Sequence, residues 1–286
     1  MILRLVVCFL FAVFSITVNA NDNDCSGDCI ATNSWSAGIA LGLGELSNPL
    51  HQGRDRNVSV LPAVYFYGER FYLENTTLGY TLFENDHWSI DIKGELNKDG
   101  IYFRDSKSDQ FFATGTVVNP FPLPIPIDSD DFIPEQDVER DLSYMGGVGI
   151  SYFFADEWLI NLDLLSDVSG VHHGQQVDLS VFYTKEFGKL SFNLSVGALY
   201  QSSKLNNYYY GFDNNEFAEY DVQYKAGGGV NPYASVGLAF PVSKYFSLVA
   251  NYKYEQLSSE ISHSSLVNDD SGHFYFFGIS GHIGNH

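Results

Sequence analysis

The sequence predicts an all-β protein, a transmembrane antiparallel up-and-down β-barrel, and three observations support this fold class. Segments of about ten residues alternate apolar and polar side chains, and this is the length that a tilted strand needs to cross the hydrocarbon layer. The connections alternate between short turns and long polar stretches, as in barrels with short periplasmic turns and long external loops. The N-terminus has the composition of an export signal.

The first twenty residues predict a cleaved secretory signal peptide. Arg4 precedes an apolar run from Leu5 to Val18, and small residues end the segment at Ala20. The run is too short for a transmembrane helix, which needs about 18 residues or more. We therefore expect a signal peptide at 1–20, a short periplasmic segment at 21–33 and the barrel at 34–286.

Two cysteines remain after the predicted cleavage, and the composition excludes several classes of partner. Cys25 and Cys29 would lie in an oxidising compartment, which permits a disulfide between them, but they supply too few ligands for a metal site. The formal net charge is −20, which excludes a nucleic-acid partner. We expect no cofactor.

The strands follow from period-two alternation, and Trp88 to Asn97 gives the clearest case. There Trp88, Ile90 and Ile92 alternate with Ser89, Asp91 and Lys93, so one face is apolar and the other polar. The same alternation predicts twelve strands, at 34–44, 58–67, 70–75, 77–83, 87–97, 142–154, 158–167, 176–186, 189–201, 231–240, 245–256 and 272–283. The segment 70–83 has the weakest pattern, and ten strands is the alternative.

Alternation alone does not decide which face points inward, because a soluble sandwich or lipocalin buries its apolar face. Aromatic residues at the predicted strand ends favour a membrane barrel, since Tyr and Trp gather at the two bilayer interfaces. These residues are Trp35, Tyr67, Tyr72, Trp88, Tyr152, Trp158, Tyr200 and Tyr245. The apolar face is therefore expected to contact lipid.

The polar faces of the strands then predict the contents of the lumen. The charged residues expected there are Asp91, Lys93, Glu95, Asp163, Asp178, Lys253 and Glu255. Mixed charges in a barrel of about twelve strands favour a lumen filled by ion pairs and water. The alternative is a narrow channel for small solutes.

Long external loops are expected at 98–141, 202–230 and 257–271, and further external loops at 45–57 and 167–175. The loop at 98–141 contains a proline run from Pro120 to Pro126, followed by an acidic stretch from Asp128 to Asp141. Carboxylates could collect divalent cations that bridge to lipopolysaccharide phosphates. A solvated acidic loop is the favoured interpretation.

Two groups of loop residues are candidates for a hydrolase site, which needs a hydroxyl and a histidine oriented by a third group. The first group contains Asp167, Ser169, His172 and His173, and the second contains His263, Ser264 and Ser265. Both groups lie in predicted external loops, where solvated polar residues are usual. No catalytic motif with a required spacing is present, so we expect no enzymatic activity.

Several stretches of the chain resemble the MipA/OmpV family of outer-membrane proteins. They are Gly42-Leu43-Gly44 with Pro49, residues 61–73 with Leu78-Gly79-Tyr80, residues 167–174, Tyr209-Tyr210-Gly211-Phe212, and residues 244–248. The resemblance spans nearly all of the expected mature chain. It implies a location in the outer membrane of a Gram-negative bacterium, in contact with lipid and lipopolysaccharide. It also implies a scaffold role that links a murein transglycosylase to a penicillin-binding protein.

Overall fold

A computed structural model describes residues 33–51, 53–103, 110–115, 120–123, 140–212 and 223–285. The predicted signal peptide, Cys25 and Cys29, and residues 124–139 of the proline-rich acidic loop lie outside these ranges. Within the described part, no helix is long and apolar enough to cross a bilayer.

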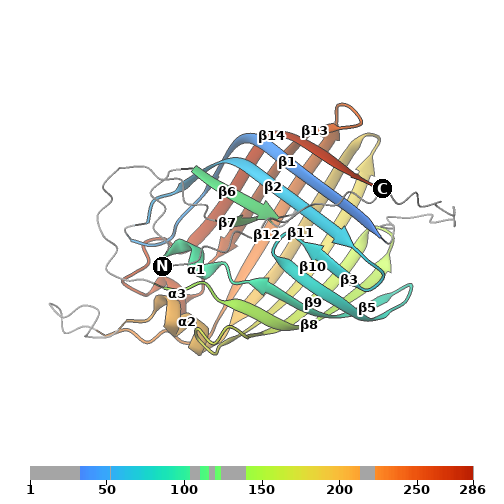
Figure 1. The fold of residues 1–286 in the computed structure, drawn as a ribbon. Coiled ribbons are helices and arrows are strands. Elements are labelled where there is room, and N and C mark those ends of the chain that lie inside the picture. The colour runs from blue at the N-terminus through green and yellow to red at the C-terminus, as the bar shows by residue number, and fades with distance from the viewer. Residues whose placement is uncertain are drawn as a thin grey trace, which may run out of the picture.

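Twelve strands form the predicted closed antiparallel barrel (Figure 1). They are β1 (Ser34–Leu46), β2 (Arg56–Tyr67), β3 (Phe71–Glu74), β4 (Thr77–Glu84), β5 (Trp88–Leu96), β8 (Tyr144–Ala155), β9 (Trp158–Asp167), β10 (Gln175–Phe187), β11 (Leu190–Gln201), β12 (Gly229–Pro241), β13 (Phe246–Gln256) and β14 (Ser271–Asn285). Each strand pairs with its neighbours, and β1 pairs with both β2 and β14, which closes the barrel. Every strand begins and ends within two residues of its expected bounds.

The apolar faces of the strands point outward, as predicted. On β5, Ile92 is 52% exposed whereas Asp91 is 8% exposed, because successive side chains of a strand point to opposite faces. Leu43 on β1 and Phe277 on β14 form a directly paired apolar couple on the outer surface. An outer surface covered by exposed apolar side chains is expected of a barrel that contacts lipid, and not of one that is surrounded by water.

Aromatic side chains follow one rim of the barrel across neighbouring strands. Trp88 packs against Tyr152 with ring centroids 4.5 Å apart, and Trp158 packs against Tyr183 at 4.7 Å. This arrangement fits the expected interfacial girdle. The expectation that Tyr67 and Tyr72 belong to the girdle is wrong, because both line the inner cavity.

The weak segment at 70–83 is a short hairpin, so the prediction of twelve strands is correct. Strands β3 and β4 are joined by a turn at Asn75 and Thr76, and Asn75 adopts the left-handed conformation with φ of 57°, which Asn tolerates better than most residues.

The loop expected at 98–141 contains two strands that the sequence pattern does not indicate. They are β6 (Gln110–Gly115) and β7 (Pro120–Leu123), and β6 pairs parallel to β2. This parallel pairing is an exception to the otherwise up-and-down arrangement.

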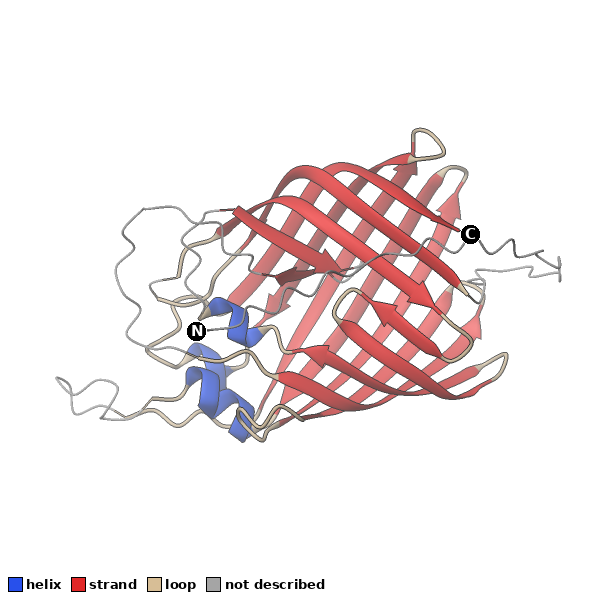
Figure 2. Ribbon diagram, in the orientation of Figure 1, coloured by secondary structure: helices blue, strands red, loops and turns tan. Residues whose placement is uncertain are grey.

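Three short helices lie at one end of the barrel, opposite the end where β14 finishes (Figure 2). They are α1 (Asp99–Tyr102), α2 (Ser203–Tyr210) and α3 (Ser259–Ser262), and each belongs to a predicted long loop. The short turns lie at the other end, so the helices are on the external side. The polar composition predicts solvated loops here, but the structure packs parts of them into a buried core.

Candidate functional site: the barrel lumen and its external cap

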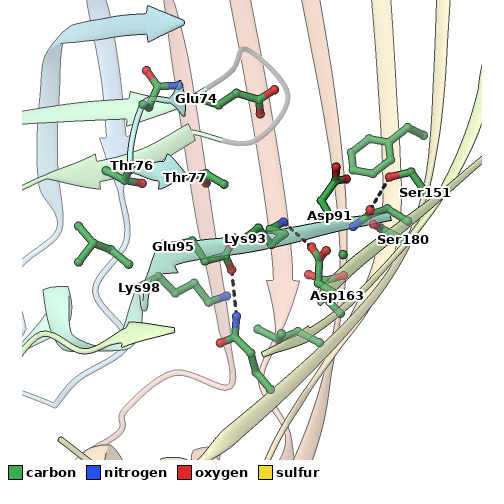
Figure 3. Close-up of a pocket in the computed structure, with 18 of the residues that line it drawn as sticks. Glu74, Thr76, Thr77, Asp91, Lys93, Glu95, Lys98, Ser151, Asp163 and Ser180 are labelled. Carbon is green, nitrogen blue, oxygen red and sulfur yellow. Dashed lines mark hydrogen bonds and ion pairs between the residues drawn. The ribbon is translucent and has the colours of Figure 1, made fainter. Parts of the chain in front are cut away.

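The lumen contains a cavity of about 990 Å³. Its lining begins at the periplasmic turns near Glu69 and Asp86, and it reaches Pro49 in the first external loop. Its walls are the inward faces of the strands, which the alternation makes polar. Figure 3 shows charged side chains from several strands around this space.

All seven residues predicted from the alternation to face the lumen line this cavity: Asp91, Lys93, Glu95, Asp163, Asp178, Lys253 and Glu255. They come from strands β5, β9, β10 and β13. The structure therefore brings together side chains that are far apart in the sequence.

One ion-pair group is centred on Lys93 of β5. Its Nζ lies 2.8 Å from Asp163 Oδ2 and 3.6 Å from Glu95 Oε2. The side chain reaches across the neighbouring strand at Gly149, where an added Cβ would lie 3.0 Å from Lys93 Cδ. Glycine at this position thus leaves the space that the lysine occupies.

A second group contains Lys98, which the strand alternation does not indicate. Lys98 forms an ion pair with Glu255. Its position just beyond β5 predicts a solvated external loop, but this loop turns into the barrel. Nearby, Tyr233 donates its hydroxyl hydrogen to Asp178 Oδ1 at 2.9 Å, and Lys253 Nζ lies 4.7 Å from the centre of the Tyr233 ring.

An apolar core caps the lumen at the external end. Leu205, Tyr209 and Tyr210 of α2 and Ile261 of α3 are completely buried, and they pack with inward-facing Leu165 of β9. Leu165 departs from the polar alternation of its strand, and the cap explains this departure: the lumen wall is apolar where the helices pack on it.

A buried carboxylate ties α1 to this cap. Asp99 accepts hydrogen bonds from Tyr210 Oη at 2.7 Å and from Gln201 Nε2 at 2.5 Å. Burial raises the pKa of Asp99 above its ordinary value. The hydrogen bonds thus join the loop after β5 to α2 and to the end of β11.

The first predicted hydrolase group is brought together, but as a loop-stabilising network. Asp167 Oδ1 accepts from the backbone N–H and hydroxyl of Ser169 at 2.9 and 2.6 Å. Its Oδ2 accepts from the backbone N–H groups of His172 and His173 at 2.7 and 2.8 Å. A carboxylate that accepts several local N–H groups holds the loop in one conformation.

The hydroxyl that approaches the histidine belongs to Ser143, which lies outside both predicted groups. Ser143 Oγ lies 2.9 Å from His172 Nε2, and Asp167 Oδ2 lies 3.9 Å from His172 Nδ1. However, the backbone N–H of Gly174 donates to Nδ1 at 2.9 Å, so the neutral ring carries its hydrogen on Nε2 and donates to Ser143. The ring in this tautomer cannot take a proton from the serine.

Burial supports the structural interpretation of this histidine. Ser143 is completely buried, and the hydroxyl of Tyr209 donates to its Oγ at 3.1 Å. Burial also lowers the pKa of His172, which keeps the ring neutral. Ser143, His172 and Tyr209 together fasten the loop after β9 to the cap.

The second predicted hydrolase group is not assembled into a site. Ser264 is buried and donates its hydroxyl hydrogen to the backbone oxygen of Tyr210 at 2.6 Å, whereas His263 is exposed. Ser264 thus joins α3 to α2.

A family model described as MltA-interacting protein MipA matches residues 38–282. This chain belongs to that family. Among relatives, the protein named "Putative outer membrane protein YiaT" of Escherichia coli is 26% identical over 85% of this chain and 89% of its own length. Outer membrane protein OmpV of Vibrio cholerae is 22% identical over 86% of this chain and 84% of its own.

A further relative, the MltA-interacting protein of Escherichia coli, is 22% identical over 80% of this chain and 83% of its own length. Among solved structures, the COG4313 outer membrane channel from Pseudomonas putida covers 92% of this chain and 100% of its own, with 9% identity and a TM-score of 0.39. The relatives place this MipA-family chain in the outer membrane, as predicted, and none of these names describes an enzyme.

Proposed function

We propose that this protein is a non-enzymatic scaffold of the outer membrane that presents its periplasmic rim to murein enzymes. The packed external cap is the main support, because buried Tyr209 and Tyr210 fill the mouth through which a wide pore would open. The turns at Asp86 and Asp156, on the periplasmic side, are exposed. A relative carries the name MltA-interacting protein, which supports a murein transglycosylase as one partner. A penicillin-binding protein as a second partner follows from the family resemblance alone.

Site-specific photocrosslinking in cells tests this proposal. A photoreactive residue is placed at Asp86 or Asp156, and at Val168 in an exposed external loop as the matched control. We expect adducts with a murein transglycosylase from the two periplasmic positions and none from Val168. Adducts from Val168 alone, or no adduct with any murein enzyme, would contradict the scaffold.

A narrow channel is the second candidate function, and one observation favours it. The cavity extends from the periplasmic turns to Pro49 on the external side, alongside the cap. Planar-bilayer recording with purified protein tests this function. Discrete conductance steps are expected of a channel, and their absence over a wide voltage range would eliminate it.

A further inference from the structure

Three aspartates lie in one row across the lumen wall. In the strand register, Asp91 of β5 pairs with Gly149 of β8, Gly149 pairs with Asp163 of β9, and Asp163 pairs with Asp178 of β10. Directly paired residues point to the same face, and like charges in such positions destabilise a sheet. The row therefore needs positive charge in the lumen.

Lys93 and Lys98 each leave one oxygen of a carboxylate partner without a donor. Lys93 contacts Asp163 Oδ2, but Asp163 Oδ1 is buried and has no hydrogen-bond partner. Lys98 contacts one oxygen of Glu255, and the other, Oε1, is likewise buried without a partner. Asp163 is 7% exposed and Glu255 is 8% exposed, and both line the cavity.

The two carboxylate oxygens point to a positively charged donor that enters the cavity. Leaving a buried acceptor unpaired costs free energy, and the cost is larger for a charged group. Nine carboxylates of the described chain line the cavity against four lysine and arginine side chains: Glu69, Glu74, Glu84, Asp86, Asp91, Glu95, Asp163, Asp178 and Glu255 against Arg70, Lys93, Lys98 and Lys253. The periplasmic turns contribute to the same lining, so a periplasmic solute has a route to these groups.

The arrangement of the carboxylates favours an extended organic cation over a metal ion. Asp163 and Asp178 lie on neighbouring strands, about 4.8 Å apart along the wall, and Asp91 lies about twice as far from Asp163 because Gly149 of β8 comes between them. Among the described residues, no group of three or more His, Cys, Asp or Glu side chains is arranged to hold a metal ion. Apolar and aromatic side chains, including Leu159, Phe182 and Tyr72, line the same space and suit a methylene chain.

We propose that the lumen binds a linear polyamine, with its ammonium groups distributed along the carboxylates of β5, β9 and β10. The Asp163 carboxylate pairs with one ammonium group once Oδ1 turns from its buried position against Gly149 toward the cavity, and the other ammonium groups face Asp91 and Asp178. The ammonium of Lys253 already lies over the Tyr233 ring, which illustrates how these walls accommodate an alkylammonium group. This site is independent of a scaffold role at the periplasmic rim.

Isothermal titration calorimetry with spermidine as the probe tests the site in the detergent-solubilised full-length barrel at low salt. We expect saturable binding that weakens as salt is raised. Asp163→Asn and Asp178→Asn are each expected to weaken binding at least about ten-fold, since one charge-assisted hydrogen bond contributes about 1.5–3 kcal/mol. Asp156→Asn, in an exposed periplasmic turn, is the matched control and should bind as the unmodified protein does.

Heat-modifiable gel mobility establishes that each variant is folded, and Asp91→Asn replaces any variant that is not. Unmodified protein that gives no saturable spermidine binding overturns the proposal regardless of the variants. Equal spermidine affinity of the lumen variants and of Asp156→Asn also overturns the proposal, because spermidine would then bind to carboxylates outside the lumen. Displacement of spermidine by equimolar magnesium would overturn the preference for an extended cation.

Discussion

The substitution Asp167→Asn tests the conclusion that this residue organises an external loop. The Asp167 side chain is completely buried, and each of its oxygens accepts hydrogen bonds from the loop. An amide replaces one acceptor with a donor. In the orientation that preserves the bonds to Ser169, the NH₂ group faces the backbone N–H groups of His172 and His173.

The expected cost follows from those two backbone groups. The hydrogen bond from the His172 N–H is partly buried and the one from the His173 N–H is exposed. An unsatisfied buried donor costs about 1–3 kcal/mol and a hydrogen bond to a charged group contributes about 1.5–3 kcal/mol, so the two losses together cost about 2–4 kcal/mol when solvent and relaxation absorb part of the penalty. If the loop opens locally, the opening equilibrium rises about 30- to 700-fold, because each 1.4 kcal/mol is a factor of ten. The barrel strands do not depend on these bonds and should remain folded.

Hydrogen exchange measured by mass spectrometry on the detergent-solubilised barrel reports this opening directly. We expect faster exchange in peptides that cover 168–174 and unchanged exchange in β10 and β11. Asp156→Asn, in an exposed turn at the opposite end, controls for the loss of one carboxylate. Unchanged protection of 168–174 in Asp167→Asn would refute the argument that this carboxylate holds the loop.

Three further predictions concern the cap, its histidine and the lipid face. Leu205→Ala removes a completely buried side chain from the cap core and should destabilise the cap by about 2–5 kcal/mol. Bilayer recordings of this variant should then show more frequent open events. Unchanged recordings would mean that the cap does not close the lumen. Burial lowers the pKa of His172, so its contribution to loop stability is present above about pH 6.5 and is lost as the pH falls. Exchange at 168–174, corrected for intrinsic rates, should accelerate below that pH, and this extra pH dependence should vanish in His172→Gln but persist in His263→Gln. Ile92→Arg places a charge on the lipid face and should lower the free energy of unfolding, measured by urea titration in lipid vesicles, by up to about 2–4 kcal/mol. The control Ser151→Arg, on the cavity lining, should lower it much less. Equal losses in the two variants would contradict the assigned faces.

The sequence by itself determined the strands and their faces. Alternation has a period of two only in strands, and the apolar outer face is set by the lipid that surrounds it. The alternation, together with the aromatic residues at the strand ends, therefore assigns Asp91 and Asp163 to the lumen, where both line the cavity. Each strand spans the hydrocarbon layer with one face toward lipid and the other toward the lumen, so the local pattern of its side chains carries the necessary information.

Only the tertiary structure decided how the external loops fold and which lumen residues meet. Leu165 is an exception in the pattern of its strand, and the packing of α2 and α3 on it supplies the reason. Lys98 and Ser143 carry no signal in the sequence, because their partners Glu255 and His172 lie on distant segments of the chain. Loop packing and ion pairing depend on which residues lie close together in space, and the alternation along a strand does not specify this. The closure of the barrel, in which β1 pairs with β14, brings these distant segments together.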